Sequence, residues 1–168
     1  MSHLLFTPWR YSYLTAPKGE AAACIFCEAA RSPDPESTLT LWADRRIVIL
    51  LNRFPYTNGH VMIAPVTHVA RLYESGEEQL TAIIRASAEA QKILSDTYRP
   101  DGFNIGMNFG QAAGAGIADH YHVHVVPRWA GDSNFMSVTA DTRMIPEELP
   151  ATFAKLRPKF AELGSTFS

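Results

Sequence analysis

Short apolar runs separated by turn residues predict an antiparallel sheet. Apolar runs of four to seven residues that are bounded by Gly, Pro, Asn or Asp are typical of strands. These runs lie at Leu39–Trp42, Ile47–Leu51, His60–Ala64, Phe103–Phe109 and Tyr121–Val126. Asp44-Arg45-Arg46 separates the first two runs and is typical of a tight turn. The pattern therefore predicts a meander of antiparallel strands.

One segment has helical periodicity. Between Gly76 and Tyr98 the apolar residues recur at intervals of three and four, and Pro100 follows the segment. Two shorter helices are predicted, one over the alanine-rich residues 20–31 and one from Pro150 to Leu156, which Pro158 follows. Strands in a meander, interrupted by one long helix, predict an α+β domain: an antiparallel sheet with helices packed mainly on one face.

Length and composition favour a single domain. The chain has 168 residues, of which 46% are hydrophobic and 19% charged. A chain of this size forms one globular domain with a sizeable core. We therefore expect a single domain over residues 1–168, with an N-terminal arm at 1–20 and a C-terminal extension at 140–168.

Charge and hydropathy exclude several classes of partner. Fifteen Lys and Arg against 17 Asp and Glu give a net charge of -2, which argues against a broad electrostatic contact with nucleic acid or anionic lipid. No run approaches the roughly 20 apolar residues that a membrane helix needs, and the first ten residues lack the pattern of a signal peptide. We expect no nucleic-acid or membrane partner and a cytoplasmic location.

Three histidines within five residues are the main candidate for chemistry. His120, His122 and His124 alternate with apolar or aromatic residues. In a strand, alternate side chains share one face and lie about 7 Å apart, so the intervening side chains point to the core. An imidazole accepts protons, attacks phosphorus and binds metals near neutral pH, whereas a solvated strand face more often carries Thr, Lys or Glu. The spacing indicates a reactive site.

Two cysteines form a second candidate site. Cys24 and Cys27 have the C-x-x-C spacing, and one turn of helix brings residues i and i+3 together. Two cysteines are too few for a disulfide-stapled secreted scaffold. Taken alone, this pair is compatible with a metal site, a redox pair or simple packing.

The histidine segment resembles a known family. Residues His120–Val126 match the signature of the histidine triad (HIT) proteins, His-φ-His-φ-His-φ-φ with φ apolar. The likeness extends to Leu51–Pro55 and Gly59–Pro65. Three further stretches resemble the diadenosine tetraphosphate phosphorylase branch of that family, and they are Trp9-Arg10-Tyr11, Gly102–Asn108 and Pro127–Trp129 with Gly131–Phe135. The resemblance implies a HIT-like fold.

The resemblance also implies a reaction. His122 is the expected nucleophile that carries a nucleotidyl group, His124 the residue that contacts phosphate oxygens, and His120 the third catalytic member of the triad. Diadenosine tetraphosphate and inorganic phosphate would then yield ADP and ATP. Two alternatives stay open: a HIT hydrolase of dinucleoside polyphosphates or nucleoside phosphoramidates, and a nucleotide-binding interaction protein.

A nucleotide site is implied beside the triad. Glycines in the loop before the triad let backbone N–H groups approach phosphate oxygens, and the family places a ribose contact at Asn52. The residues expected at the nucleotide are Asn52, His60, Asn108, Gly114, Gly116 and His124. Hydrolase branches carry Gly-Gln-Ser or Gly-Gln-Thr where this chain has Ala115, Gly116 and Ile117. Without the glutamine there is room for inorganic phosphate as the acceptor.

The resemblance gives the cysteines a metal-binding role. In several family members a C-x-x-C pair, a histidine after a strand that ends in Pro, and the first triad histidine bind zinc. Those positions hold Cys24, Cys27, His68 and His120. Four protein ligands leave no place for water, so the expected role of zinc is structural. The family also implies a homodimer through the long helix and a sheet edge, with a tetramer as a larger assembly.

Overall fold

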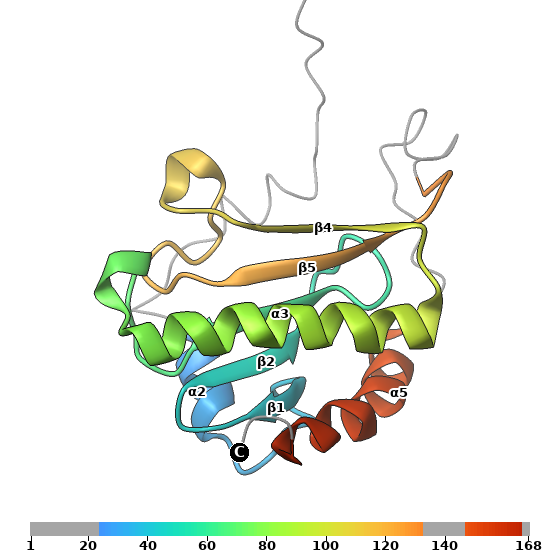
Figure 1. Cartoon of the computed structure of the whole chain (residues 1–168), viewed down its shortest axis with the longest axis horizontal. Coiled ribbons are helices and arrows are strands. Elements are labelled where there is room, and N and C mark those ends of the chain that lie inside the picture. The colour runs from blue at the N-terminus through green and yellow to red at the C-terminus, as the bar shows by residue number, and fades with distance from the viewer. Residues whose placement is uncertain (1–23, 133–146, 166–168) are drawn as a thin grey trace, which may run out of the picture.

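Five strands form a single antiparallel sheet in the order β1-β2-β3-β5-β4 (Figure 1). The strands are β1 (Thr40–Ala43), β2 (Ile47–Leu51), β3 (Val61–Pro65), β4 (Gly102–Met107) and β5 (Val123–Arg128). The structure is a computed structural model, and it describes residues 24–132 and 147–165. Each neighbouring pair of strands is antiparallel, which confirms the predicted antiparallel sheet. The predicted meander holds for β1-β2-β3, whereas β5 lies between β3 and β4. The expected N-terminal arm lies outside the described residues.

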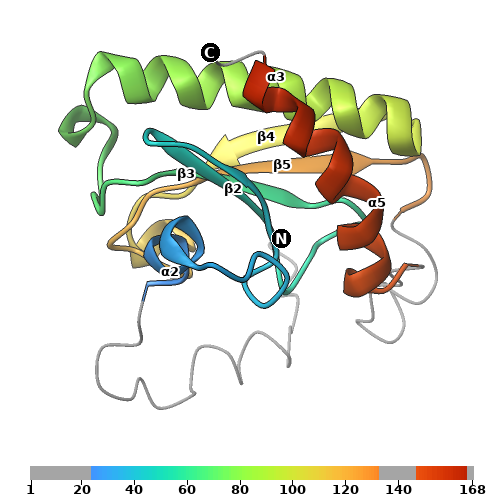
Figure 2. The same ribbon diagram turned by 90° about the horizontal axis from the view of Figure 1, so that it is seen from below.

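Helices cover both faces of this sheet unequally. The described residues form the helices α2 (Ile25–Arg31), α3 (Glu77–Tyr98) and α5 (Leu149–Ala161), with short 3-10 turns η1 (Leu72–Glu74), η2 (Gln111–Ala113) and η3 (Glu162–Ser165). Helices α3 and α5 lie on one face and α2 lies on the other (Figure 2). The α+β class is therefore confirmed. No helix in the described part of the chain has the length and apolar character needed to cross a bilayer.

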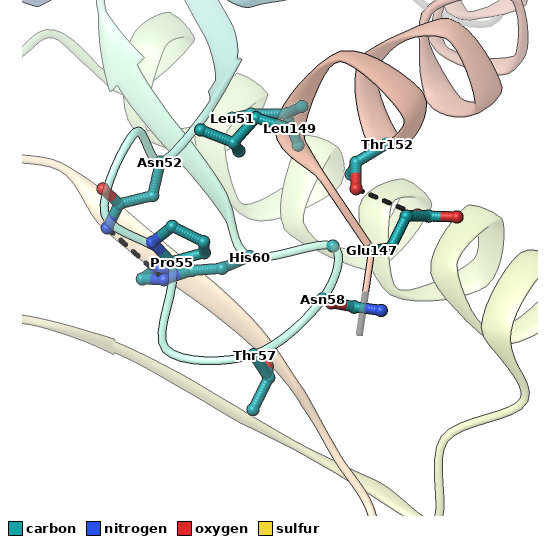
Figure 3. Close-up of a pocket in the computed structure, with 10 residues that line it drawn as sticks. Leu51, Asn52, Pro55, Thr57, Asn58, His60, Glu147, Leu149 and Thr152 are labelled. Atoms are coloured by element: carbon teal, nitrogen blue, oxygen red, sulfur yellow. Dashed lines mark hydrogen bonds between the residues drawn. The ribbon is translucent and has the colours of Figure 1, made fainter. Parts of the chain in front are cut away.

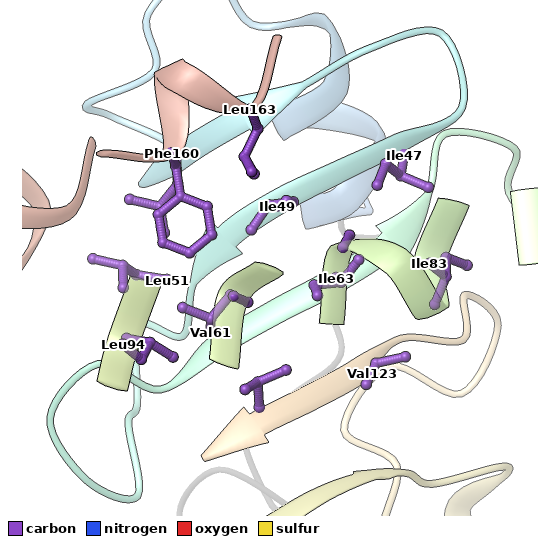
Figure 4. Close-up of a cluster of buried hydrophobic side chains, with 14 of the residues drawn as sticks. Ile47, Ile49, Leu51, Val61, Ile63, Ile83, Leu94, Val123, Phe160 and Leu163 are labelled. Carbon is purple, nitrogen blue, oxygen red and sulfur yellow. The ribbon is translucent and has the colours of Figure 1, made fainter. Parts of the chain in front are cut away.

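Alternation along β2 divides the apolar residues between the two faces. All five residues of β2 are buried, as expected for a strand that is covered on both sides. Ile47, Ile49 and Leu51 belong to the main core, which packs against α3 and α5 (Figure 4). Val48 and Leu50 belong to a smaller cluster that packs against α2. The larger share of apolar burial therefore lies on the α3 side.

The same alternation around the start of β5 places apolar side chains on one face of the sheet and the triad histidines on the other. Tyr121, Val123 and Val125 are buried in the main core, as the sequence predicts. His124 pairs with Met62 of β3, and Met62 belongs to the α2 cluster. The histidines therefore lie on the α2 side of the sheet.

The strand that carries the histidines starts later than predicted. A strand was expected over Tyr121–Val126, but β5 begins at Val123. The backbone N–H of Tyr121 donates to the carbonyl of Val69 at 2.9 Å, and the pairing with β3 ends at Val123. Of the three triad histidines, His124 alone is part of the β-ladder. The chain ahead of it is free to turn its side chains away from strand geometry.

The last helix is longer than predicted. It was expected to end near Leu156 because Pro158 follows, but α5 continues through Pro158 to Ala161. A proline inside a helix removes one hydrogen bond and costs about 3 kcal/mol. Leu156 and Phe160 are fully buried on the same face of the helix, and this burial outweighs the local cost.

Gly59 is a point where the fold depends on glycine. Its φ is +71°, and a Cβ atom there would lie 2.9 Å from Cδ2 of Leu94 and 3.0 Å from the Tyr98 ring. We expect Gly59→Ala to lower the free energy of unfolding by about 2 to 4 kcal/mol, because strain and overpacking add. Urea denaturation measures this change. Gly102→Ala is the matched control, since no atom lies within 4 Å of its Cβ position, and an equal loss in both variants would contradict the prediction.

Candidate active site and metal centre

His122 has one ring nitrogen fixed by the backbone. Its Nδ1 lies 3.0 Å from the carbonyl oxygen of His120, and because a carbonyl only accepts, Nδ1 carries the hydrogen. Nε2 then holds the lone pair. The residue is 4% exposed, and burial lowers the pKa of His122 below its ordinary value. His122 is therefore a neutral imidazole with an oriented nucleophilic nitrogen.

His60 and His124 form a second oriented pair. Nδ1 of His60 accepts the backbone N–H of Tyr56 at 3.1 Å, and it lies 3.3 Å from Nδ2 of Asn52. The hydrogen of His60 is therefore on Nε2, which donates to Nδ1 of His124 at 2.9 Å. Burial lowers the pKa of His124 to about 4, so the ring is neutral. Because its Nδ1 accepts from His60, its hydrogen is on Nε2. The pair thus presents an N–H donor near His122.

Aromatic rings pack around these imidazoles. The ring centroids of His122 and His124 lie 4.7 Å apart at 75°, closer than the strand spacing predicts, because His122 precedes the strand. Phe26 lies 4.7 Å from the His122 ring. Tyr56 stacks on His60 at 4.8 Å. The imidazoles are held by ring contacts as well as by hydrogen bonds.

The four predicted metal ligands lie together, and we call them the metal-ligand cluster: Cys24, Cys27, His68 and His120. Their ligand atoms all lie within 4.8 Å of one another. Sγ of Cys24 is 3.2 Å from Nδ1 of His120, and Sγ of Cys27 is 3.3 Å from Nδ1 of His68. Two thiols and two imidazoles are a donor set that suits a tetrahedral metal ion.

The surroundings of the metal-ligand cluster fit a bound cation. Nε2 of His120 donates to the carbonyl of Pro65 at 2.8 Å, which leaves Nδ1 unprotonated and facing the thiols. Burial lowers the pKa of His120 to about 4, so the ring is neutral, as a ligand requires. Burial and the neighbouring Cys24 raise the pKa of the Cys27 thiol. A bound cation would lower the pKa of this thiol and so oppose the effects of burial and of Cys24.

The glycine-rich loop connects β4 to the histidine segment. It begins beyond Met107, which pairs with Val123 at the start of β5. Gly110 and Gly114 have φ of 78° and 84°, values that favour glycine. Ile117 packs against the smaller apolar cluster beneath α2 and serves as an apolar contact there. Asn108, Gly114 and Gly116 therefore lie in the loop that directly precedes the histidine segment along the chain.

A small cavity lies between the β2–β3 connection and the start of α5 (Figure 3). Asn52, Thr57 and His60 line one side, and Glu147 and Thr152 line the other. Its volume is about 10 Å³, the space of roughly one water molecule. The cavity is too small for a nucleotide, and its walls pack the segment that carries His60 against α5.

Asn52 also has a local role. Its Oδ1 accepts the backbone N–H of Phe54 at 2.9 Å, as expected of a turn residue. This bond turns Nδ2 toward His60. The amide therefore closes the turn and contacts the histidine pair at the same time.

Comparisons with known proteins identify the family. A family model for the HIT domain matches residues 36–131. The chain belongs to the HIT family. The AP-4-A phosphorylase of Mycobacterium tuberculosis is 34% identical to it over 94% of this chain and 84% of that protein. This relative is an enzyme, and the chain is an enzyme of the same HIT family.

Solved structures of HIT proteins share the fold. A Zn-bound histidine triad family protein from Mycobacterium smegmatis has a TM-score of 0.65 and 27% identity, and the match covers 86% of this chain and 97% of that one. A hypothetical histidine triad nucleotide-binding protein from Sulfolobus tokodaii has a TM-score of 0.64 and 22% identity, with 83% and 93% covered. The second likeness concerns the HIT fold alone.

Sequence reasoning missed several contacts of the HIT site. It placed His60 near the pocket but did not predict its pairing with His124, which depends on how β3 and β5 align. It also missed the ring contacts of Phe26 and Tyr56. The position of Phe26 between the two cysteines was the available signal. Trp9-Arg10-Tyr11 lies outside the described residues.

Buried neutral histidines predict a specific pH dependence of stability. The pKa values of His120 and His124 are about 4 in the fold, against 6.5 ordinarily, so between these values the unfolded chain binds more protons. Stability of the metal-free protein should therefore fall as pH drops from 6.5 toward 4, by up to about 1.4 kcal/mol per pH unit for each histidine. Urea unfolding at pH 7, 6 and 5 measures this slope. His124→Gln should reduce the slope, and a flat profile in the parent protein would contradict the assignment.

Proposed function

We propose that the protein is a dinucleoside polyphosphate phosphorylase that forms a nucleotidyl intermediate on His122. The observation that carries the proposal is the neutral imidazole of His122, with Nδ1 bonded to the His120 carbonyl and Nε2 holding a lone pair. An oriented, unprotonated nitrogen is what nucleophilic attack on phosphorus requires. The 34% identity with an AP-4-A phosphorylase over nearly the whole chain supports this substrate class.

The first step transfers AMP to the protein. Nε2 of His122 attacks the α-phosphorus of diadenosine tetraphosphate, a P–N bond forms, and the P–O bond to the β-phosphate breaks as ATP leaves. Charge develops on the leaving oxygen. His124, whose hydrogen is on Nε2, donates to that oxygen, and His60 holds Nδ1 of His124.

The second step releases the nucleotide. An oxygen of inorganic phosphate attacks the α-phosphorus, the P–N bond to His122 breaks, and ADP leaves. Gly116 and Ile117 stand where hydrolase branches carry glutamine and a hydroxyl, and this departure supports phosphate over water as the acceptor. The catalytic residues we propose are His120, His122 and His124, where His120 acts through its carbonyl.

Nucleotide contacts are assigned to residues near the triad. We assign the ribose hydroxyls to Asn52, whose amide already lies beside His60. Phosphate oxygens are assigned to Asn108, to the backbone N–H groups of Gly114 and Gly116, and to His124. Because the protein has a net charge of -2, such local N–H donors rather than a basic surface are needed to hold polyphosphate.

Zinc is the ion we assign to the metal-ligand cluster. Two thiolates and two imidazoles form a closed tetrahedral set, which is typical of structural zinc, and a HIT neighbour of 27% identity is a Zn-bound protein. When bound, zinc would supply a structural cross-link between α2 and the segments that carry His68 and His120. None of the proposed chemical steps passes through it.

We propose that the protein forms a homodimer, the assembly that the family resemblance implies. Strand β4 is an edge of the sheet, and Ile105 on it is 46% exposed. Ile84 on α3 is 64% exposed. Apolar residues at a sheet edge and on the long helix suit pairing with a second copy.

Product analysis tests the proposed reaction. With diadenosine tetraphosphate and inorganic phosphate we expect equal amounts of ADP and ATP, since phosphate accepts the AMP group. Anion-exchange chromatography separates the products. AMP with ATP, formed equally well without phosphate, would indicate a hydrolase. No turnover together with tight AMP binding would indicate a nucleotide-binding protein.

Substitution of the nucleophile tests the intermediate. His122→Ala should lower kcat by at least about 10³-fold, because the attacking nitrogen is lost. His122→Gly should be equally inactive, and added imidazole should restore part of its turnover by occupying the vacated space. Far-ultraviolet circular dichroism checks that both variants fold. Normal turnover by a folded His122→Ala variant would refute the covalent mechanism.

A further inference from the structure

Phe26 lies at the junction between the metal-ligand cluster and His122. It sits on α2 between Cys24 and Cys27, and it is 0% exposed. Its ring centroid is 4.7 Å from that of His122 and 5.1 Å from that of His120. The short segment that supplies two metal ligands therefore also supplies the ring that packs on the proposed nucleophile.

Helix α2 is weakly held by its own structure. It has seven residues, and the side chain of its N-cap residue, Cys24, makes no capping hydrogen bond. Its buried residues Phe26 and Ala29 belong to the smaller of the two apolar clusters in the described residues, and not to the main core. A helix this short is unstable without tertiary contacts. A metal ion bound by Cys24 and Cys27 would add two strong attachments at this helix.

A second connection runs through His120. Its Nδ1 faces Sγ of Cys24 at 3.2 Å, and its Nε2 donates to the Pro65 carbonyl at 2.8 Å. Its own carbonyl accepts the Nδ1 hydrogen of His122 at 3.0 Å. One residue is thus tied both to the metal-ligand cluster and to the orientation of the nucleophile.

We propose that Phe26 is a positioning residue for His122, and that zinc in the metal-ligand cluster holds Phe26 against the imidazole. Binding of zinc and binding of a nucleotide phosphate at His122 are then energetically coupled. The coupling rests on the proposed function, because it requires the nucleotide to bind at His122. Coupling between two sites is reciprocal: AMP must increase the affinity for zinc by the same factor by which zinc increases the affinity for AMP.

Two affinities measured in the same protein test the coupling. Zinc affinity is measured by competition with a chromophoric chelator, with and without saturating AMP. AMP affinity is measured by calorimetry on zinc-loaded and metal-free protein. We expect both to change by the same factor, at least about fivefold. In Phe26→Leu the factor should fall toward one. Val48→Ala is the matched control, because it loosens the same apolar cluster and keeps Phe26, so its factor should be unchanged.

Nitrogen NMR of the His122 ring gives a readout that needs no nucleotide. With zinc bound, the parent protein should show a single tautomer protonated at Nδ1. Metal-free protein and zinc-loaded Phe26→Leu should show a mixture of both tautomers, since the ring is less constrained.

The outcomes separate this inference from the proposed function. The coupling is wrong if zinc does not bind, if zinc and AMP bind independently, or if Phe26→Leu keeps the full factor and the single tautomer. Failure of AMP to bind either form would refute the proposed nucleotide site instead. In that case the NMR comparison alone decides whether zinc and Phe26 position His122.

Discussion

The hydrogen bond from Nδ1 of His122 to the carbonyl of His120 is the constraint on which the site depends. It fixes which ring nitrogen is free, and it requires the His120 backbone to leave the regular ladder before β5 begins. That departure is held by the bond from the Tyr121 N–H to Val69 and by the bond from His120 Nε2 to Pro65. The reactive geometry is therefore built into a three-residue segment at the entrance to a strand.

Because its histidines are neutral, this site does not offer positively charged imidazoles to a bound anion. Burial keeps His122 and His124 unprotonated, so the imidazoles offer N–H dipoles and lone pairs rather than positive charge. A polyphosphate bound here would meet oriented dipoles in place of counter-ions. Such an arrangement favours selective stabilisation of charge that develops during a reaction over tight binding of the ground state.

The sequence predicts the elements of the fold better than their contacts. Periodicity located all five strands and the long helix to within about two residues. The family resemblance predicted the grouping of Cys24, Cys27, His68 and His120, and the structure places their ligand atoms close together. The approach of His60 to His124 depends on the alignment of two strands that are distant in sequence. The continuation of α5 through Pro158 depends on burial of Phe160. Both effects arise from tertiary packing, which local patterns do not encode.

The unequal covering of the sheet has a consequence for how such a protein changes over time. Most of the apolar packing lies against α3 and α5, whereas the histidines lie on the opposite face beside one short helix. Residues around the histidines can therefore be replaced with little effect on the packing that keeps the chain folded. In a scaffold divided in this way, substitutions on the histidine face can alter what is bound there while the free energy of unfolding, which depends on the opposite face, changes little.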